Sequence, residues 1–367
     1  MRLTNDTCEK ELFMDQIKIH SNLYDYTVDF TDDFSEQIES FSANTVYVID
    51  RNVYKFYEDK FSAVPKAHIY LMDAVEEKKN MDTVMDIMGF FQRLHIHKDW
   101  KVVCFGGGIT QDVTTTASYL YLRNVNWYLF PTTLLSMSDS CIGGKSGLNF
   151  KQVKNQIGVF YPPKKIFIDT HFISTLTGQD YLNGWGEILK FSLTESLDFY
   201  HDLKNEKQYI PCENIAAYIH RGLSVKKKII ETDEFDLGLR KVLNYGHTFG
   251  HALEAYTDNV IPHGMAVIWG IDVVNFIAVR EGILSEDFYL DVKKLIDDSF
   301  LIDEIVIGDP DRLIEYVKSD KKVVGNKVSL AVPDGTGKLI LHPMAIDDRF
   351  EGLFRKYLKE THEYYSD

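Results

Sequence analysis

Polar side chains recur at helical spacing in the segment LGLRKVLNYGHTFGHALEAY. Positions i, i+4, i+7 and i+11 share one face of a helix, and here they are held by Arg240, Asn244, His247 and His251. These groups are costly to bury without partners, and a solvated face more often carries Lys and Glu than His and Asn. The spacing predicts one helix with a binding or catalytic stripe.

A glutamate and a further histidine could complete a metal site with this stripe. Glu187 and Lys190 lie one helical turn apart in GWGEILKF, and His263 begins the next apolar helix. One carboxylate and two imidazoles would leave an open position on zinc or a similar cation, as catalytic centres require. Spacing alone would instead nominate His247 and His251, but HTFGH lacks the glutamate of HExxH, which disfavours a metalloprotease. The pattern indicates a metal site without choosing its ligands.

Two glycine-rich segments could bind phosphate. Segment 139–158, DSCIGGKSGLNFKQVKNQIG, sets lysines and amides around paired glycines, which suits an oxyanion but equally a solvated loop. Gly106, Gly107 and Gly108 join a strand to a helix and could admit a pyrophosphate or simply form a tight turn. Asp50 could accept a hydrogen bond from a ribose or cap a helix. The charged strings KKK at 226–228 and DKK at 320–322 are typical of solvated faces.

The elements that must position these residues divide the chain in two. Apolar β-rich runs at 44–50, 67–73, 101–107 and 125–130 alternate with helical stretches such as 79–94 and 110–122, which predicts a parallel sheet covered by helices. Residues 15–30 could add an antiparallel strand pair. From about residue 178 the pattern is helical, apart from a hairpin at an Asp-Gly turn near the C-terminus. We expect an α/β nucleotide-binding domain at 1–177 and a mainly helical metal- and substrate-binding domain at 178–367, with the site in the cleft between them.

Composition limits the class of protein. The 367 residues fit about two domains, and 40 Lys plus Arg against 55 Asp plus Glu give a net charge of −15, which argues against nucleic acid as a partner. An anionic substrate is still compatible, since a basic pocket can lie inside an acidic shell. There is no secretory segment at the N-terminus and no run of about 18 apolar residues, so we expect no membrane span. A cytoplasmic location also fits the widely separated cysteines, Cys8, Cys104, Cys141 and Cys212.

Taken together, these motifs resemble the 3-dehydroquinate synthase family and related sugar-phosphate cyclases. The resemblance runs from about residue 44 to residue 340 and rests on GGGITQD, YLRNV, PTTLLSMSDSCIGGKSG, VKNQIGVFYPP, NGWGEILK, GLRKVLNYGHTFGHALE and IPHGMAV, in this order. A combination of that length is far more specific than any one of its motifs.

The resemblance implies a role for individual residues. It implies that a divalent metal, zinc or cobalt, is bound by Glu187, His247 and His263. The implied catalytic residues are Asp139, Lys145, Lys190, Asn244 and His251. The implied substrate-binding residues are Arg123, Asn155, Lys226, Arg240 and one of Lys321 and Lys322. The implied NAD site comprises Asp50, Glu76, Lys79, Gly106, Gly107, Gly108, Asp112, Thr132, Thr133, Asp139, Lys145, Lys154, Thr175 and Asn183. Arg123 would reach the active site of a partner subunit, which implies a homodimer.

The resemblance also implies a reaction. In the family, NAD oxidises a secondary alcohol of a heptulosonate phosphate, phosphate leaves, the hydride returns, and an aldol closure forms the carbocycle. This predicts a lyase that converts 3-deoxy-arabino-heptulosonate 7-phosphate to 3-dehydroquinate. Relatives whose substrates lack the carboxylate tend to alter the positions of Arg240, Asn244 or His251. All three are present here, which favours a small carboxylated sugar-acid phosphate.

Some positions depart from the family pattern and keep alternatives open. They are Gln111, Thr114 to Thr116, Trp185, Gly186 and Met265. One alternative is a cyclase of specialised metabolism that acts on an amino analogue or a heptulose phosphate. Another is a metal-dependent polyol dehydrogenase, although that group generally has an aspartate at the position of Glu187. A catalytically silent binding protein is disfavoured, because it would be free to lose Lys190, Asn244 and His251.

Overall fold

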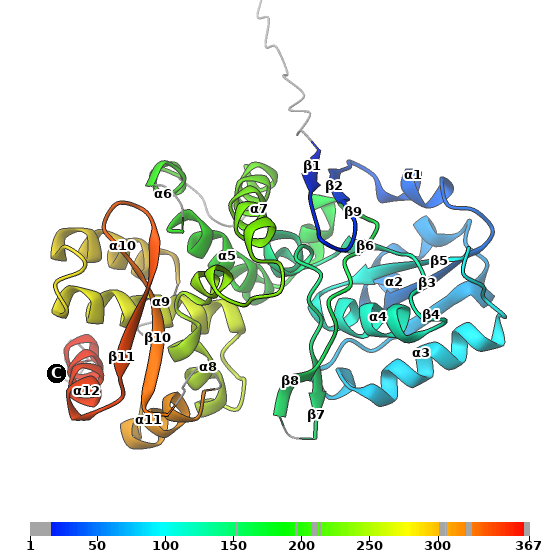
Figure 1. Cartoon of the computed structure of the whole chain (residues 1–367). Coiled ribbons are helices and arrows are strands. Elements are labelled where there is room, and N and C mark those ends of the chain that lie inside the picture. Colours follow the sequence, from blue (N-terminus) through cyan, green and yellow to red (C-terminus); the bar gives the residue numbers. More distant parts are fainter. Residues whose placement is uncertain are drawn as a thin grey trace, which may run out of the picture.

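The computed structural model describes residues 16–151, 153–194, 197–206, 212, 214–300, 305, 307–320 and 325–362. Lys321, Lys322 and Cys8 therefore lie outside the described residues. Figure 1 shows an α/β part that carries the long sheet and a second, mainly helical part beside it. Helices α5 (Gly178–Ser192) and α7 (Ile215–Thr232) lie where the two parts meet.

The α/β part is built on a seven-stranded sheet of order β1-β2-β9-β6-β5-β3-β4. Five parallel strands form its body: β3 (Thr45–Asp50), β4 (Ile69–Met72), β5 (Lys101–Gly106), β6 (Trp127–Pro131) and β9 (Lys165–Ile168). Runs such as VYVI and VVCF are buried on both faces, which is why these strands read as continuous apolar segments. Strand β2 (Tyr26–Phe30) pairs parallel with β9 and antiparallel with β1 (Ile17–Ile19). The predicted parallel sheet and the added strand pair are confirmed.

The order of the five parallel strands locates a binding crevice. In chain order it is 2-1-3-4-5, so the topological switch lies between β3 and β5, where open α/β sheets bind ligands at the carboxyl ends of their strands. Asp50 ends β3, and Gly106 ends β5 just before α4 (Gly108–Leu120). The other helices of this part are α1 (Phe34–Glu39), α2 (Arg51–Tyr57) and α3 (Met81–Arg93).

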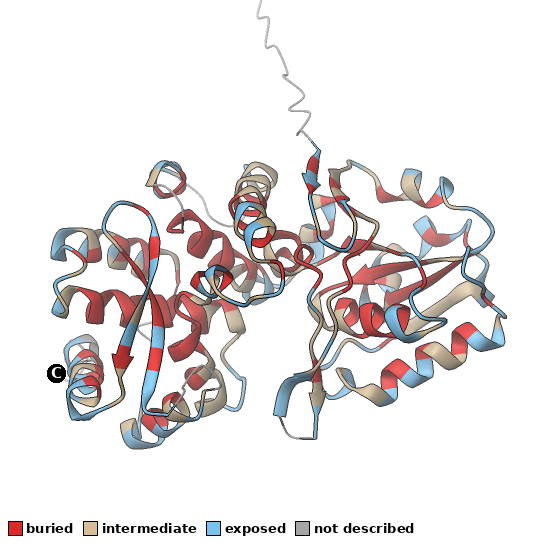
Figure 2. Ribbon diagram, in the orientation of Figure 1, coloured by how far each residue is buried: buried red, intermediate tan, exposed pale blue. Residues whose placement is uncertain are grey.

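The second part packs its helices around α9 (His263–Arg280), which runs through the buried interior in Figure 2. Around it lie α5, α8 (His247–Tyr256), α10 (Glu286–Ser299) and α12 (Asp348–His362). Helix α7 packs on α5, α6 (Leu197–Lys204) also lies against α5, and α11 (Pro310–Ser319) lies against α8. Strands β10 (Lys327–Pro333) and β11 (Leu339–Ala345) form the predicted hairpin. By length and composition alone α9 could cross a membrane, but most of it is buried inside the molecule.

The single helix predicted through Arg240 and His251 is wrong. Residues Leu239–Asn244 form a 3-10 segment (η6), the chain turns at Gly246 with φ of 77°, and α8 starts at His247. A Cβ at Gly246 would collide with the carbonyl oxygen of Val267 on α9. The break therefore combines a left-handed turn with a close approach of two backbones, and both require glycine.

The lysine-rich segment is also more ordered than a loop. Ser136–Ser140 form a π-helical turn (η4), and the residues that follow build an antiparallel hairpin of β7 (Leu148–Phe150) and β8 (Val153–Ile157). In Figure 1 this hairpin projects from the α/β part. Its strands are largely exposed, so they hold their lysines and amides at a surface rather than in a core.

Candidate functional site

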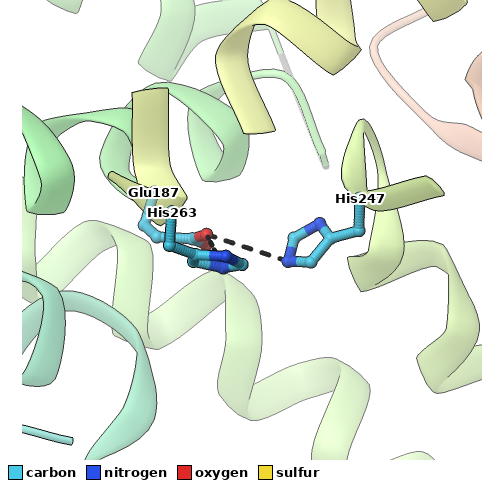
Figure 3. Close-up of side chains that lie close together, drawn as sticks. All are labelled: Glu187, His247 and His263. Atoms are coloured by element: carbon cyan, nitrogen blue, oxygen red, sulfur yellow. Dashed lines mark ion pairs between the residues drawn. The ribbon is translucent and has the colours of Figure 1, made fainter. Parts of the chain in front are cut away.

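A glutamate and two histidines from three helices meet beside the junction of the two parts. Glu187 lies on α5, while His247 and His263 are the first residues of α8 and α9. Figure 3 shows the three side chains facing one another: Glu187 Oε1 lies 3.9 Å from His247 Nε2 and 3.6 Å from His263 Nε2. One ligand atom from each falls within 4.8 Å of the others, which is compatible with a single metal ion.

Glycines allow these helices to approach closely enough for the three side chains to meet. A Cβ on Gly186 would lie 2.6 Å from the carbonyl oxygen of Gly264, and one on Gly264 would collide with Asn183. Gly250 on α8 faces Ala266 on α9 in the same way, at 2.9 Å. Asn183 also accepts a hydrogen bond from the Gly264 N–H at 2.5 Å and so caps α9 beside His263. The backbone contacts of α9 with α5 and α8 therefore fix the relative positions of Glu187, His247 and His263.

Each histidine is oriented through its second ring nitrogen. His247 Nδ1 lies 3.0 Å from the carbonyl oxygen of Tyr245, and His263 Nδ1 lies 3.2 Å from Glu254 Oε2. Such partners fix which nitrogen faces a metal. Sequence reasoning missed Glu254, whose only signal is its place one helical turn after His251 on α8. His251, Glu254 and His263 form a second group with compatible spacing, in which Glu254 is already used by His263.

The donor set and its burial fit a divalent cation. Glu187 is fully buried, and neither of its carboxylate oxygens has a hydrogen bond from any residue that the structure describes. Buried carboxylate oxygens normally have such partners, so their absence among protein groups needs an explanation. An ion pair with Lys190 accounts for one oxygen and leaves the other facing the histidines. One carboxylate and two imidazoles with an open position are a typical catalytic zinc donor set.

A row of charges, buried except for the half-buried Asp139, continues from this cluster. Asp139, on η4, pairs with Lys226 of α7 at 2.8 Å, and Lys226 also donates to the Asp139 carbonyl oxygen at 2.6 Å. Burial alone would raise the pKa of Asp139, but Lys226 and Lys190 hold it well below its usual range. Burial would likewise lower the pKa of Lys190, but Glu187 and Asp139 raise it. Asp139 thus stays ionised and Lys190 stays cationic around neutral pH. Two lysines then face one carboxylate at this point, so the site carries cations although the whole chain is acidic.

Arg240 lies at the end of this row and is 5% exposed. Its guanidinium donates to the carbonyl oxygens of Gly143 and Glu234. Burial lowers the pKa of Arg240, although Asp236 and Asp139 partly offset this effect. Burial, with Arg240 close by, also lowers the pKa of Lys226. The predicted solvated face at 226–228 is therefore wrong for Lys226, whose side chain points inward.

The hairpin residues contribute exposed cations and amides. Lys145 pairs with Asp236 at 2.5 Å and is half exposed, while Lys154 donates to Asn259 Oδ1 at 2.5 Å. Asn259 belongs to the loop between α8 and α9, so Lys154 links the hairpin to the helical part. Asn155 has a φ of 54° and accepts a hydrogen bond from Lys79 at 2.9 Å.

At the sheet switch point, residues of the implied NAD site gather around the glycine turn. Lys79 bridges Asn155 and Asp112, with Nζ 2.8 Å from Asp112 Oδ2. Burial raises the pKa of Asp112, and Lys79 opposes that effect. Two threonines pack on the turn: the Thr132 N–H donates to the Gly106 carbonyl at 3.1 Å, and a Cβ on Gly107 would lie 2.9 Å from Thr133. Glu76 accepts a hydrogen bond from Asn149 of β7 at 2.8 Å. Helix α4 begins at Gly108, so its first N–H groups lack helical partners, as in anion-binding turns.

Other residues of the implied site lie elsewhere or have structural partners. Asp50 caps α2 by accepting from the Asn52 N–H at 2.8 Å, which is the alternative reading of this residue. Thr175 is exposed and donates to the Phe172 carbonyl within its own turn. Arg123 is exposed after α4, and Asn244 is half-buried at the end of η6. His251 stacks on the His263 ring and pairs with Asp320 at 3.3 Å.

Fold and site together define a class: a parallel α/β domain with a dinucleotide-type glycine turn, joined to a helical domain with a metal-compatible Glu-His-His group. The family model for the 3-dehydroquinate synthase N-terminal domain matches residues 69–183, and the model for the C-terminal domain matches residues 184–323. A 3-dehydroquinate synthase from Pelagibacter ubique is 32% identical over 361 residues, which cover 93% of this chain and 98% of that protein. The chain therefore belongs to the 3-dehydroquinate synthase family.

Solved structures show the same fold. The 2-epi-5-epi-valiolone synthase ValA from Streptomyces hygroscopicus, solved with NAD+ and Zn2+, superimposes with a TM-score of 0.82 at 24% identity and covers 95% of this chain and 99% of its own. A 2-deoxy-scyllo-inosose synthase, solved with carbaglucose-6-phosphate, NAD+ and Co2+, gives 0.81 at 22% identity and covers 94% and 99%. The expected family and fold class are thus confirmed, and the chain is a cyclase of the dehydroquinate synthase type.

Proposed function

We propose that this chain converts 3-deoxy-arabino-heptulosonate 7-phosphate to 3-dehydroquinate with release of phosphate, as an NAD- and metal-dependent carbon–oxygen lyase. The observation that carries the proposal is the continuity of the buried site. Lys190 pairs with Glu187 of the metal-compatible Glu-His-His group, and Lys226 pairs with Asp139. Asp139 in turn interacts electrostatically with Arg240. The site therefore combines ligands for a metal ion, which would act as a Lewis acid, with cationic side chains that can bind an acidic substrate.

The residues present fit both cofactors. Glu187, His247 and His263 would hold zinc or cobalt, the ions found in the two solved neighbours. The glycine turn and the start of α4 would hold the NAD pyrophosphate, with Lys79 and Asp112 beside it. When bound, NAD supplies reversible hydride transfer and the cation supplies polarisation of substrate oxygens.

The chain's own residues would bind and orient the acid end of the substrate. Arg240 can offer a planar fork to a carboxylate, and Lys226 supplies a second cation nearby. Asp139 keeps Lys226 and Lys190 fixed without neutralising all the charge, because it is one carboxylate between two ammonium groups. Lys190 is 1% exposed, so it can donate hydrogen bonds to a substrate oxygen in a site with little competing water.

The phosphate end would be bound by groups that now have exchangeable partners. Lys145 and Asn155 could turn from Asp236 and Lys79 toward a phosphate, since both pairs lie in solvent-accessible positions. His251 and Asn244 lie on the helical side of the same region. One of Lys321 and Lys322 would add a further cation. His251 would donate a hydrogen bond to the phosphate.

We also propose a homodimer in which Arg123 enters the partner's site. Leu122, Arg123 and Asn124 all have positive φ, which is rare for three consecutive residues other than glycine. Such strain persists where function requires it. Tyr119, Leu120 and Leu122 are apolar and exposed around this turn, which suits a surface that a second copy covers.

The remaining expectations follow the same proposal. Residues 1–177 would bind NAD, and residues 178–367 would carry the metal ligands and most substrate contacts. Three of the cysteines lie within the described residues and all three are buried. Cys104 and Cys141 are free thiols, which agrees with a reducing, cytoplasmic location. The net charge of −15 disfavours nucleic acid as a partner.

Phosphate release from the purified chain with NAD and zinc or cobalt tests the reaction. We expect turnover of the heptulosonate phosphate without net NADH formation, because the hydride returns to the product. Turnover of a heptulose phosphate, glucose 6-phosphate or an amino analogue, but not of the acid, would assign a different cyclase substrate. Steady NADH accumulation with a polyol would favour a dehydrogenase instead.

Arg240→Ala tests the carboxylate assignment. Loss of a buried charged hydrogen-bond partner costs about 2–5 kcal/mol in binding, so kcat/KM for the acid substrate should fall by at least about 30-fold. Lys241→Ala, next in sequence but exposed, serves as the control and should change little. A decrease below tenfold in Arg240→Ala would mean that this residue does not hold the carboxylate.

A further inference from the structure

The turn between β1 and β2 reaches across to the loop that carries Arg240. The Glu234 carboxylate accepts hydrogen bonds from Ser21 Oγ at 2.5 Å, the Asn22 N–H at 2.7 Å and Asn22 Nδ2 at 3.0 Å. The His20 N–H donates to Glu231 on α7 at 2.8 Å, and β1 itself packs against α7. Figure 1 shows β1 and β2 beside α7 at the meeting of the two parts. The N-terminal strand pair is thus bound to the helical part at this turn.

The same loop holds the guanidinium of Arg240 from one side. The main-chain carbonyl of Glu234 accepts from Nη1 of Arg240. Asp233 accepts from the backbone N–H groups of Leu237, Gly238 and Arg240 at 2.9, 2.7 and 3.0 Å. Residues 233–240 therefore form one hydrogen-bonded unit, and moving Glu234 would move the acceptor that orients Arg240.

The β1–β2 pair also supports Arg240 from the other side. The Gly143 carbonyl accepts from both terminal nitrogens of Arg240 at 3.4 Å, and the Gly143 N–H donates to the hydroxyl of Tyr26 on β2 at 2.8 Å. Gly143 has a φ of 97°, and a Cβ there would collide with the guanidinium. Of the two residues whose carbonyls accept from Arg240, Gly143 is thus held by Tyr26 of β2, and Glu234 is held through its side chain by the β1–β2 turn.

From these contacts we infer that the β1–β2 turn is a positioning element for Arg240, acting through Ser21 and Asn22 on Glu234 and through Tyr26 on Gly143. The role rests on the proposed function, in which Arg240 binds the substrate carboxylate. A guanidinium has five N–H donors in a rigid plane, so the carbonyls that take some of them decide where the others point. The turn would thereby set the affinity for the acid end of the substrate without touching it.

The test compares a double variant, Ser21→Ala with Asn22→Ala, against Lys18→Ala in the full chain loaded with NAD and zinc. Lys18 lies on the same strand pair and is exposed, and its ion pair with Asp25 does not involve Glu234. Loss of the hydrogen bonds from these two side chains should raise KM for the heptulosonate phosphate by about tenfold and leave kcat within about twofold, the pattern of lost uniform binding. Lys18→Ala should match the wild type.

A second readout does not depend on the substrate. Phenylglyoxal modifies accessible arginines, and peptide mass spectrometry gives the rate at each position. Arg240 should react several times faster in the double variant than in the wild type, while exposed Arg349 reacts equally in both. Glu234→Gln retains a carbonyl acceptor and should give an intermediate rate, and thermal unfolding of each variant checks that it is folded.

The outcomes separate this inference from the proposed function. If the wild type does not turn over the heptulosonate phosphate, the proposed substrate fails, and the Arg240 modification rate alone decides whether the turn positions this residue. Unchanged modification in the double variant overturns the inference. In an active enzyme, an unchanged KM, or a fall in kcat matched by a loss of stability, also overturns it, because the turn would then be only structural.

Discussion

Glu187, His247 and His263 are held at one end of the candidate site by helices whose glycines permit backbone contact. At the other end, Lys145 lies just before the exposed β7–β8 hairpin and Lys154 lies on β8. The first group is fixed by buried main chain, and its side chains have little freedom to move apart. The side-chain amines of the second group pair with Asp236 and Asn259 at the surface.

This difference indicates two modes of binding in one site. Exposed ion pairs contribute little stability and exchange readily, so the hairpin can release its partners and turn its cations to a phosphate. Buried charges cannot exchange partners cheaply, so the metal end must be preorganised before any ligand arrives. The following predictions compare the two ends, from the largest expected effect to the smallest.

Glu187→Gln should remove most of the affinity for zinc, because it replaces the only carboxylate in the group while keeping its volume. Competition with a chromogenic chelator measures the affinity directly. The decrease should exceed the roughly 10–100-fold typical of residues that only orient a ligand. Glu254→Gln supplies that smaller reference, since Glu254 contacts His263 alone of the three. Equal losses in the two variants would contradict the assignment of Glu187.

Asp139→Asn should destabilise the fold by about 3–5 kcal/mol, because it leaves Lys226 and Lys190 buried without their shared carboxylate. The effect depends on pH in a defined direction. The pKa of Asp139 is lower in the folded than in the unfolded protein, so its contribution is complete above about pH 4 and decreases as the pH falls below that value.

Urea unfolding of both proteins between pH 7 and pH 3 measures this contribution. The difference in unfolding free energy between wild type and Asp139→Asn should shrink toward acid pH. A difference that stays constant, or grows as the pH falls, would show that the buried pair does not stabilise the protein as we describe.

Gly186→Ala should cost about 1–3 kcal/mol of stability through overpacking and should also weaken metal binding, because α5 must move away from Gly264. Gly178→Ala in the first turn of the same helix is the matched control. Its Cβ would meet no atom within 4 Å, and alanine favours a helix more than glycine does. Thermal unfolding with and without zinc separates the loss of stability from the loss of metal binding. If Gly186→Ala and Gly178→Ala showed the same unfolding temperatures, the close contact of Gly186 with Gly264 would not be what stabilises the site.

Lys145→Ala should change the unfolding free energy by less than about 1 kcal/mol, because its pair with Asp236 is exposed. The same change should raise KM for a phosphorylated substrate markedly. Asp236→Asn keeps the lysine and removes its resting partner, so it should leave KM unchanged or lower it. A large loss of stability in Lys145→Ala would show that the lysine end is held as firmly as the metal end, contrary to the proposed difference between them.

Much of the α/β part could be predicted because its signal is local. The apolar run at 101–107 forms strand β5 (Lys101–Gly106), and helix α4 begins at the glycines that follow it, as expected. The continuous helix through Arg240 and His251 could not be excluded locally, since a 3.6-residue period passes through Gly246 without interruption. Only the contact of that glycine with Val267 on α9 explains the break.

For the candidate site, too, some features could be predicted from local sequence and others depended on contacts between distant segments. Residue types alone indicated a metal and an anion, because imidazoles, carboxylates and lysines in mostly apolar helices have few other uses. Glu254 escaped notice because a glutamate on a helix ordinarily faces solvent. The run of three lysines at 226–228 indicated a solvated face, and only the family resemblance implied a binding role for Lys226. The run itself gives no sign that one of its lysines turns inward to Asp139.

By itself the sequence determined the donor chemistry, the parallel sheet, the glycines and, through its motifs, the family. The tertiary structure decided which donors meet. His247 and His251 are neighbours on one helix, but it is His247 and His263, from different helices, that face Oε1 of Glu187. That choice depends on how closely α5, α8 and α9 approach, and such distances are set by packing between segments far apart in the chain.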